Sequence, residues 1–300
     1  MVSNVSILEE KINIHTNYDI TLLSPIKCGG KVKYITFPST IDEVIESIKF
    51  SKQNDLKLFI LGGLTNTLVL DSGLDGLAIS TKNLKGITVK DDVISAKCGE
   101  SLSHVIQSAI NNNLSGLEPL SGIPGTIGGA LKGNAGSYNR SISDIFYSAE
   151  IVLPDLSIKK IYNSDDLFSY RASNLPKNSF IYSVSLRLNK VDDNKPLIKQ
   201  REEYILKRKE MGQYDKPSLG CVFKNPTPLS AGLLIDKCGL KGLSYNGAAV
   251  SESHANFITI EKNTTANSYL TLANKVREEV FKRFGLTLNY EINIMGQNWA

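Results

Sequence analysis

The stretch Ser121-Gly122-Ile123-Pro124-Gly125-Thr126-Ile127-Gly128-Gly129-Ala130 contains four glycines and no charged side chain. Glycine loses more backbone freedom on folding than any other residue, so this cluster indicates that the chain turns sharply or approaches another group closely. Backbone N–H groups exposed in such a loop suit a phosphate. We call residues 120–138 the glycine block and expect it to bind an anion, although these residues alone also allow a plain connection between strands.

A second glycine loop upstream makes the ligand interpretation more specific. The apolar run 59–61 leads into Gly62-Gly63-Leu64-Thr65-Asn66-Thr67, and an apolar run at 68–70 follows. This order predicts a strand, a tight polar turn and another strand. Together the two loops offer small, hydroxyl and amide side chains that suit the two ends of one pyrophosphate.

The composition is that of an ordinary soluble globular protein. The 300 residues are 41% hydrophobic and 21% charged, enough chain for one large or two moderate domains. No apolar run approaches the roughly 18 residues that cross a bilayer. The first residues, Met1–Lys11, lack the basic-then-apolar layout of a secretory signal. We therefore expect a cytoplasmic protein without membrane insertion.

Metal and nucleic-acid binding are not expected. The cysteines and histidines are scattered, without the C-x-x-C spacing of a zinc or redox site; they are Cys28, Cys98, Cys221, Cys238, His15, His104 and His254. The net charge of +4 is mild and unclustered, so it falls short of a nucleic-acid footprint. No obligate protein partner is predicted.

Periodicity and capping signals predict an α+β chain. Thr40 followed by Glu43 is typical of a helix start. Helices are expected at 40–50, 102–111, 199–211, 231–238 and 265–284, and strands at 56–61, 147–153, 179–188, 255–260 and 288–294. Residues 192–196 read as a linker, so the predicted parts are an N-terminal segment 1–25, a first domain 26–192 and a C-terminal domain 193–300.

Seven blocks, in this order, resemble the flavin-dependent UDP-N-acetylenolpyruvoylglucosamine reductases. They are Gly62-Gly63-Leu64-Thr65-Asn66, residues 121–130, Asn134-Ala135-Gly136, Tyr170-Arg171-Ala172-Ser173, Gly220-Cys221-Val222-Phe223-Lys224-Asn225-Pro226, Ser251-Glu252-Ser253-His254-Ala255-Asn256-Phe257-Ile258 and Glu291. Glycine loops recur across FAD proteins of one fold, and the C-terminal blocks narrow the resemblance to the reductase. The direct run from Arg171 into 180–184 resembles the shorter subtype, which lacks an inserted tyrosine loop.

The resemblance implies an FAD-binding domain of the PCMH/vanillyl-alcohol-oxidase type, followed by a smaller α+β substrate-binding domain. FAD would take hydride from NADPH and pass it to the enolpyruvyl double bond, giving UDP-N-acetylmuramate for peptidoglycan precursor synthesis. The expected FAD ligands are Gly62, Gly63, Thr65, Asn66, Thr67, Gly122, Pro124, Gly125, Thr126, Gly128, Gly129, Asn134 and Gly136.

Three side chains are expected to carry the chemistry. Hydride addition leaves negative charge on the neighbouring carbon, shared with the substrate carboxylate, and Arg171 would stabilise this charge. Glu291 would act with the arginine in positioning and polarising the intermediate. Cys221 stands where the family usually has serine as the proton donor, and a thiol with an unperturbed pKa of about 8.5 still donates a proton. The residues alone favour a surface salt bridge for Arg171 and an exposed position for Glu291. Cys221 could then be a small buried residue.

The remaining site residues are assigned with alternatives. Lys224 and Asn225 would bind the diphosphate or sugar, and Tyr138 and Tyr170 either face the ligands or fill the core. His254 is expected to make a structural hydrogen bond. Leu64 stands where the family that this chain resembles has a glycine. A side chain at that position narrows the allowed backbone and would crowd a phosphate, weakening FAD binding.

Two other functions fit the same sequence. One is a different FAD oxidoreductase on this binding domain, an oxidase of a sugar or alcohol. The other is a flavin- or UDP-sugar-binding protein that has lost turnover. The choice between NADPH and NADH is open, because the sequence contains no separate nicotinamide fingerprint.

Overall fold

The computed structural model describes residues 12–296. The described chain divides into two compact units, each built from several stretches. The first unit takes residues 12–16, 34–63 and 76–206, and the second takes 17–33, 64–75 and 207–296. The predicted domain limits stay predictions. Residues 1–11, where no secretory signal is expected, and residues 297–300 lie outside the described part.

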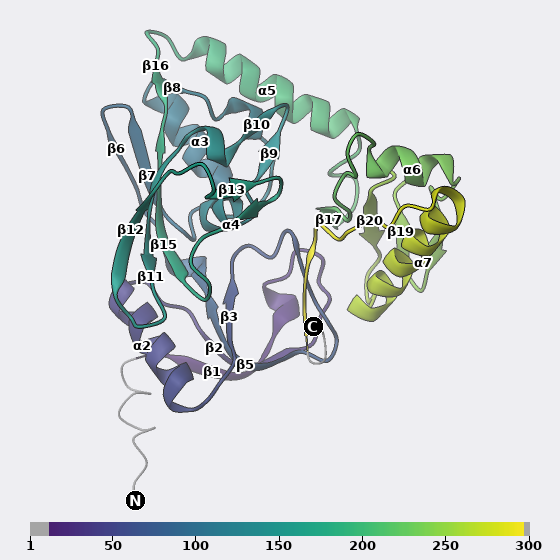
Figure 1. The fold of residues 1–300 in the computed structure, drawn as a ribbon, viewed down its shortest axis with the longest axis horizontal. Helices are drawn as coiled ribbons and strands as arrows, with labels where there is room; N and C mark the ends of the chain where they lie inside the picture. The colour runs from purple at the N-terminus through teal and green to yellow at the C-terminus, as the bar shows by residue number, and fades with distance from the viewer. Residues whose placement is uncertain (1–11, 297–300) are drawn as a thin grey trace, which may run out of the picture. The chain divides into compact units, whose positions relative to one another are not determined.

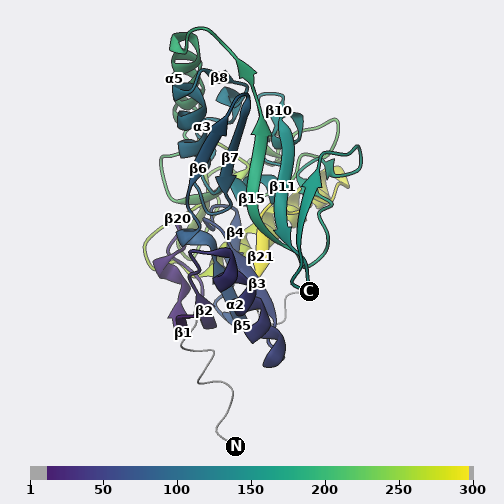
Figure 2. The same ribbon diagram turned by 90° about the vertical axis from the view of Figure 1, so that its left-hand side faces the viewer.

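A five-stranded antiparallel sheet forms the main layer of the first unit (Figure 1). Its order is β12-β11-β15-β7-β6, with β6 Ile87–Lys90, β7 Val93–Lys97, β11 Phe146–Val152, β12 Ile158–Tyr162 and β15 Phe180–Arg187. Figure 2 shows β6, β7, β15 and β11 side by side. Helices α3 (Leu102–Asn111) and α4 (Ile127–Lys132) cover one face, and their apolar side chains form a core with this sheet.

A four-stranded sheet in the order β1-β2-β5-β3 carries the first glycine loop. Its strands are β1 Ile14–Asp19, β2 Lys31–Thr36, β3 Leu58–Leu61 and β5 Leu74–Ser80, and β3 runs parallel to β5. Helix α2 (Ile41–Gln53) packs through Val44 and Ile48 into a cluster with Ile79 of β5. Thr40 caps this helix by accepting a hydrogen bond from Glu43 N, as its sequence predicts.

The second unit has an antiparallel sheet of its own, in the order β17-β20-β19-β18. Its elements are β17 Ser218–Cys221, β18 Ser244–Tyr245, β19 Ala248–Val250, β20 Phe257–Ile260, α6 Ala231–Lys237 and α7 Ala266–Phe284. Helix α7 is capped by Thr265 and ends at Gly285, whose φ of 67° suits a glycine. In the same unit β4 (Thr67–Val69) pairs in parallel with β21 (Asn293–Met295).

Short elements complete the described chain. They are β8 Leu114–Ser115, β9 Gly136–Ser137, β10 Arg140–Ser141, β13 Phe168–Ser169, β14 Ala172–Ser173, β16 Asn189–Lys190, the 3₁₀ turns η1 Ile20–Leu22, η2 Thr81–Asn83, η3 Glu118–Leu120 and η4 Ile142–Asp144, and α5 Lys195–Glu210. The mixed content confirms the predicted α+β class. The five expected helices form as α2, α3, α5, α6 and α7, and Ser101 and Thr265 accept N-terminal N–H bonds of α3 and α7.

Three local predictions are wrong. The predicted linker at 192–196 already contains the start of α5 at Lys195, where Asp193 accepts a hydrogen bond from Lys195 N. The closing strand expected at 288–294 is confined to 293–295, because the preceding backbone bonds to the loop after β17. The glycine block is not all loop, since 127–132 form α4.

Candidate functional site

Gly62 of the first glycine loop lies next to Thr126 of the glycine block in the first unit. Thr126 caps α4, its Oγ1 accepting a hydrogen bond from Gly129 N at 3.2 Å. A Cβ built on Gly62 would lie 3.0 Å from this Oγ1, and one on Gly129 would lie 3.4 Å from it. Glycine at both positions therefore leaves space around a hydroxyl at a helix start. A loop pair of this kind fits a phosphate-bearing group, as the expected FAD requires.

Glycines within the block serve different purposes. Gly122 and Gly125 have φ values of 82° and 124°, so they form the turns before α4. Gly128 instead faces protein, because its Cβ would lie 2.7 Å from Cys98 Cβ. Close packing of the helix on its neighbour is a sufficient reason for a glycine at 128.

The strip of backbone 98–102 pairs with residues 125–128 and fixes the position of α4. Ile127 N donates to Glu100 O at 2.8 Å, and Gly128 N donates to Cys98 O at 2.9 Å. Leu102 N returns a bond to Gly125 O at 3.0 Å. These three backbone hydrogen bonds therefore fix the position of the cap residue Thr126.

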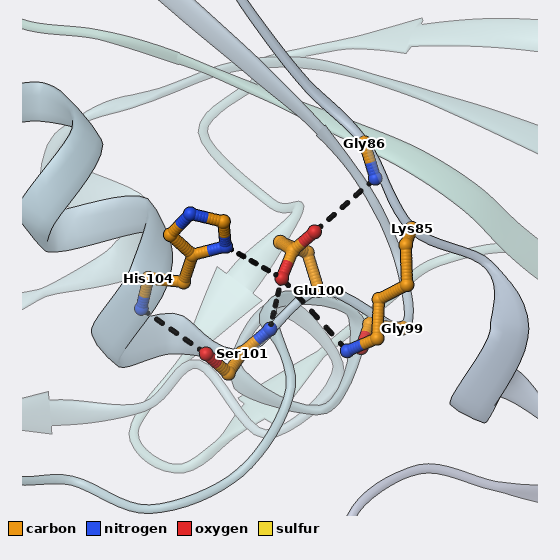
Figure 3. A network of polar contacts seen from close by, with 6 residues as sticks. All are labelled: Lys85, Gly86, Gly99, Glu100, Ser101 and His104. Atoms are coloured by element: carbon orange, nitrogen blue, oxygen red, sulfur yellow. Dashed lines mark hydrogen bonds and ion pairs between the residues drawn. The ribbon is translucent and has the colours of Figure 1, made fainter.

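The side chain of Glu100, within this strip, is a buried carboxylate that bonds to neighbouring segments (Figure 3). Glu100 is 6% exposed and accepts bonds from His104 Nδ1 at 3.0 Å and from the backbone N–H groups of Gly86 and Ser101 at 3.2 Å each. The Lys85 ammonium lies 3.8 Å away. Desolvation raises the pKa of Glu100, but these hydrogen bonds and the lysine charge outweigh it and hold the pKa below its usual value.

Arg171 is held against the glycine block. It belongs to the two-residue turn between β13 and β14, and its Nη2 donates to Gly136 O at 2.8 Å. Asn134 Nδ2 donates to Ser169 O at 3.0 Å, while its Oδ1 accepts from Ser143 N. Ser173 Oγ donates to Lys132 O at 2.9 Å. Three bonds thus pin the hairpin, and Asn134 uses both ends of its amide inside the protein.

The backbone of Arg171 has an uncommon conformation that sequence reasoning missed. Its φ is 56°, in the left-handed region that favours glycine. A large charged residue in that conformation costs roughly 1–2 kcal/mol, and such outliers cluster at functional sites. No hairpin was predicted at 168–173, because this stretch contains none of the Asn-Gly or Asp-Gly pairs that indicate a two-residue turn.

The tyrosines expected near the ligands lie on the surface of the first unit. Tyr138 is 39% exposed and Tyr170 is 54% exposed, so the alternative that they fill the core is wrong. The Tyr138 ring packs against Tyr204 of α5, with a centroid distance of 4.7 Å. The Arg171 guanidinium lies over the Tyr170 ring at 5.2 Å.

The second unit brings three distant blocks together around Glu291. Glu291 N donates to Val222 O at 2.8 Å, next to Cys221. Asn66 Nδ2 donates to Glu291 O at 3.1 Å, and Asn293 N donates to Asn66 O at 2.9 Å. The backbone of Glu291 therefore bonds both to the residue after Cys221, the candidate proton donor, and to Asn66 of the first glycine loop.

Cys221 ends a bulged strand. Ser218 pairs with Thr259 and Cys221 with Phe257, so β17 has one residue more than β20 between these pairs. The extra length includes Gly220, whose φ is 76°. Bulges of this kind change the direction of a side chain, and they are common next to active sites. The Cys221 side chain is half-buried.

Other predicted residues have contacts of their own. Asn225 Oδ1 accepts a bond from Ala231 N at the start of α6, and Lys224 N donates to Asn289 O. Leu64 has a φ of 53° and is 4% exposed, so a leucine occupies the backbone conformation that favours a glycine. His254 packs on Phe257, and its buried Nδ1 has no hydrogen-bond partner among residues 12–296, so its role as a structural hydrogen-bonder stays a prediction.

Residues 12–296 give two negative findings. They include no group of three or more His, Cys, Asp or Glu side chains that could hold a metal ion. Within the same range, no helix combines the length and apolar character needed to cross a membrane.

We predict a pH-dependent stabilisation by Glu100. Since its pKa is lowered in the folded protein, its contribution is present above the unfolded value of about 4.3 and is lost as the pH falls through the folded value. Glu100→Gln should lower the free energy of unfolding by about 1–3 kcal/mol at pH 7. Urea unfolding between about pH 7 and pH 3.5 should show this deficit shrinking. Glu278→Gln, at an exposed position of α7, is the control, and a pH-independent deficit for Glu100→Gln would contradict the prediction.

We also predict a specific order of stability for two variants of Arg171. Both Arg171→Gly and Arg171→Ala lose the bond to Gly136 O, but only glycine suits the observed φ. Arg171→Gly should therefore be more stable than Arg171→Ala by about 1 kcal/mol. Thermal and urea unfolding measure the difference. Equal stability of the two variants would show that the turn is not strained.

Known proteins match this chain over nearly its whole length. Residues 32–161 match the family model "FAD binding domain", and residues 212–295 match the model "UDP-N-acetylenolpyruvoylglucosamine reductase, C-terminal domain". The UDP-N-acetylenolpyruvoylglucosamine reductase of Caldicellulosiruptor saccharolyticus is 38% identical, covering 96% of this chain and 94% of its own. The enzyme of the same name from Latilactobacillus sakei is 35% identical, with coverages of 96% and 95%.

Solved structures agree with these matches. The crystal structure of UDP-N-acetylenolpyruvylglucosamine reductase from Thermus caldophilus superposes with a TM-score of 0.81 at 30% identity, covering 94% of this chain and 98% of that one. A berberine bridge enzyme variant, 14% identical with a TM-score of 0.52, covers 62% of this chain and 43% of its own, and shares the fold alone. The expected FAD-binding fold and C-terminal domain are confirmed, and the chain belongs to the UDP-N-acetylenolpyruvoylglucosamine reductase family.

Proposed function

We propose that this protein reduces UDP-N-acetylglucosamine enolpyruvate to UDP-N-acetylmuramate, using FAD and NADPH, as a cytoplasmic step of peptidoglycan precursor synthesis. The observation that carries the proposal is Arg171, held on the glycine block in a costly backbone conformation. Such strain persists where a function requires the side chain. The family membership supports the same reaction.

The residues around Thr126 would hold the cofactor. Gly62 and Gly129 leave its hydroxyl uncovered, and the turns at Gly122 and Gly125 present backbone to a ligand. The other proposed ligands are Gly63, Thr65, Asn66, Thr67, Pro124, Gly128, Asn134 and Gly136. Among these, Gly128 and Asn134 would act indirectly, because one packs on Cys98 and the other bonds to Ser169 and Ser143. When bound, FAD supplies the hydride that NADPH provides for the enolpyruvyl double bond.

Arg171 is assigned the developing negative charge. Addition of hydride to one alkene carbon leaves an enolate that is shared with the substrate carboxylate. A guanidinium is permanently charged and matches a carboxylate with a planar fork. Its bond to Gly136 O already orients it, so little reorganisation is needed when the charge develops. Glu291 is assigned to positioning and polarising this intermediate.

Cys221 is assigned the proton that completes the reduction. The enolate carbon must gain one proton, and a thiol is a much stronger acid than the serine hydroxyl that the family usually has there. The bulge at Gly220 gives the side chain a defined direction. Tyr138, Tyr170, Lys224 and Asn225 are proposed to bind the nucleotide sugar, and the exposure of both tyrosines supports a role in binding.

Variants at two neighbouring glycines, Gly128 and Gly129, test helix packing and cofactor binding separately. Gly128→Ala should lower the free energy of unfolding by about 1–3 kcal/mol, because its Cβ would clash with Cys98. Gly129→Ala should leave stability unchanged or raise it by up to about 1 kcal/mol, since alanine favours a helix. The same variant should weaken FAD binding about 10-fold, or about 1.4 kcal/mol. Flavin-fluorescence titration of the apoprotein measures the affinity, and wild-type affinity in Gly129→Ala would contradict the proposed cradle.

The decisive assay follows NADPH consumption with and without the enolpyruvyl UDP-sugar. We expect a yellow protein whose NADPH consumption requires that substrate. Cys221→Ala should lower turnover on the order of 100-fold or more while FAD stays bound, because general acid catalysis is lost. Cys221→Ser should keep substantial activity.

Each alternative has its own outcome in this assay. Equal activity of Cys221→Ala and wild type would contradict the assignment of the proton donor. Consumption independent of the UDP-sugar, or flavin reduction by a sugar or alcohol, would indicate another oxidoreductase. Bound flavin without any NADPH oxidation would indicate a binding protein.

A further inference from the structure

Asn256 holds the chain immediately after Cys221 by its side chain as well as its backbone. Its Oδ1 accepts a hydrogen bond from Phe223 N at 3.0 Å, and its Nδ2 donates to Phe223 O at 2.8 Å. Its backbone carbonyl accepts from Val222 N at 2.9 Å. The side chain is buried, with 3% of the residue exposed, so these bonds form away from water.

This contact takes over where the regular sheet ends. Cys221 is the last residue of β17 and the last to pair with β20, through Phe257. Beyond it, the Asn256 amide offers Phe223 one acceptor and one donor, as a neighbouring strand would. From the opposite side Val222 and Lys224 bond to the backbone of Glu291 and Asn289. The short segment 222–224 is therefore clamped between a side chain and a backbone segment.

The clamp acts on a strand that has little other regular pairing. The bulge before Cys221 interrupts the ladder, and Gly220 within it has open space, because a Cβ at this position would meet no atom within 4 Å. The glycine at 220 gives the backbone before Cys221 conformational freedom, so fixing the residues after Cys221 restricts how the strand turns at this bulge. Two bonds to Phe223 set the peptide planes that follow and so limit the direction of the thiol.

We propose that Asn256 is a positioning residue that sets the direction of the Cys221 thiol toward the carbon it protonates. The inference rests on the proposed function, in which Cys221 is the proton donor. Asn256 itself touches no reacting atom. Its loss should impair proton delivery and leave the transfer of hydride from NADPH to the bound flavin intact.

Two variants remove the clamp in different ways. Asn256→Ala leaves both polar groups of Phe223 without their side-chain partner. Asn256→Asp has nearly the same shape and keeps the acceptor, but it places a carboxylate oxygen against Phe223 O. Val280→Ala is the matched control, because it truncates a buried side chain in the core of the same unit and lowers stability without removing any of the hydrogen bonds to Phe223.

The first experiment compares two half-reactions of the holoenzyme by stopped-flow absorbance. Flavin reduction by NADPH should stay within about twofold of wild type in both Asn256 variants. Reoxidation of the reduced enzyme by the enolpyruvyl UDP-sugar should slow on the order of 10- to 100-fold, as expected for a misplaced catalytic group. In a Cys221→Ala background, Asn256→Ala should cause no further slowing, because two residues that act as a unit are not additive. Equal slowing of both half-reactions, the same pattern in Val280→Ala, or additive losses would overturn the inference.

A second readout needs no turnover. Mass spectrometry can follow the modification of Cys221 by iodoacetamide in the FAD-loaded enzyme. In Asn256→Ala the rate of this modification should change at least about threefold. The modification rate of Cys238 is the internal reference. An unchanged Cys221 rate together with unchanged reoxidation would refute the positioning role. If the UDP-sugar fails to reoxidise the wild-type enzyme, the proposed function fails, and the modification rate still decides whether Asn256 positions Cys221.

Discussion

The pairing of residues 98–102 with 125–128 is the constraint on which the first unit's site depends. It fixes α4 through the bonds of Ile127 and Gly128, and the absence of a side chain at Gly128 lets the helix lie directly on Cys98. Thr126 is thereby held where Gly62 approaches it. Since Glu100 ties this strip to α3 and to the turn at Gly86, the cradle is supported by buried charge as well as by backbone.

The position of Arg171 follows from the same constraint. Lys132 at the end of α4, Asn134 after it and Gly136 of β9 each make one hydrogen bond with the hairpin that carries the arginine. A free hairpin of two-residue strands would be unstable in water. The glycine block therefore supports a charged side chain besides forming the proposed ligand loop, and this support explains why a left-handed arginine is tolerated there.

Much of the fold could be predicted from the sequence, because its signals are local. Thr40, Ser101 and Thr265 cap helices that form where expected. The glycine block was predicted as loop because glycine disfavours helix, and close packing on Cys98 overrides that preference. The closing strand was placed too early, since alternation at 289–292 does not reveal that this backbone bonds to 222–224 instead of to β4. Contacts such as Asn66 with Glu291 join residues 225 positions apart, and nothing local indicates them.

In the second unit, backbone geometry contributes to the direction of the side chain at residue 221, which is a thiol in this chain. The direction of residue 221 depends on the bulge at Gly220, on the register with Phe257 and on the Asn256 clamp, and none of these involves the side chain at 221. In the proposed reaction, Cys221→Ser would therefore change the acidity and size of the donor more than the backbone that carries it. A site whose nucleophilic or acidic atom is positioned by its neighbours can accept a chemically different donor, provided that the new group still carries a proton at the working pH.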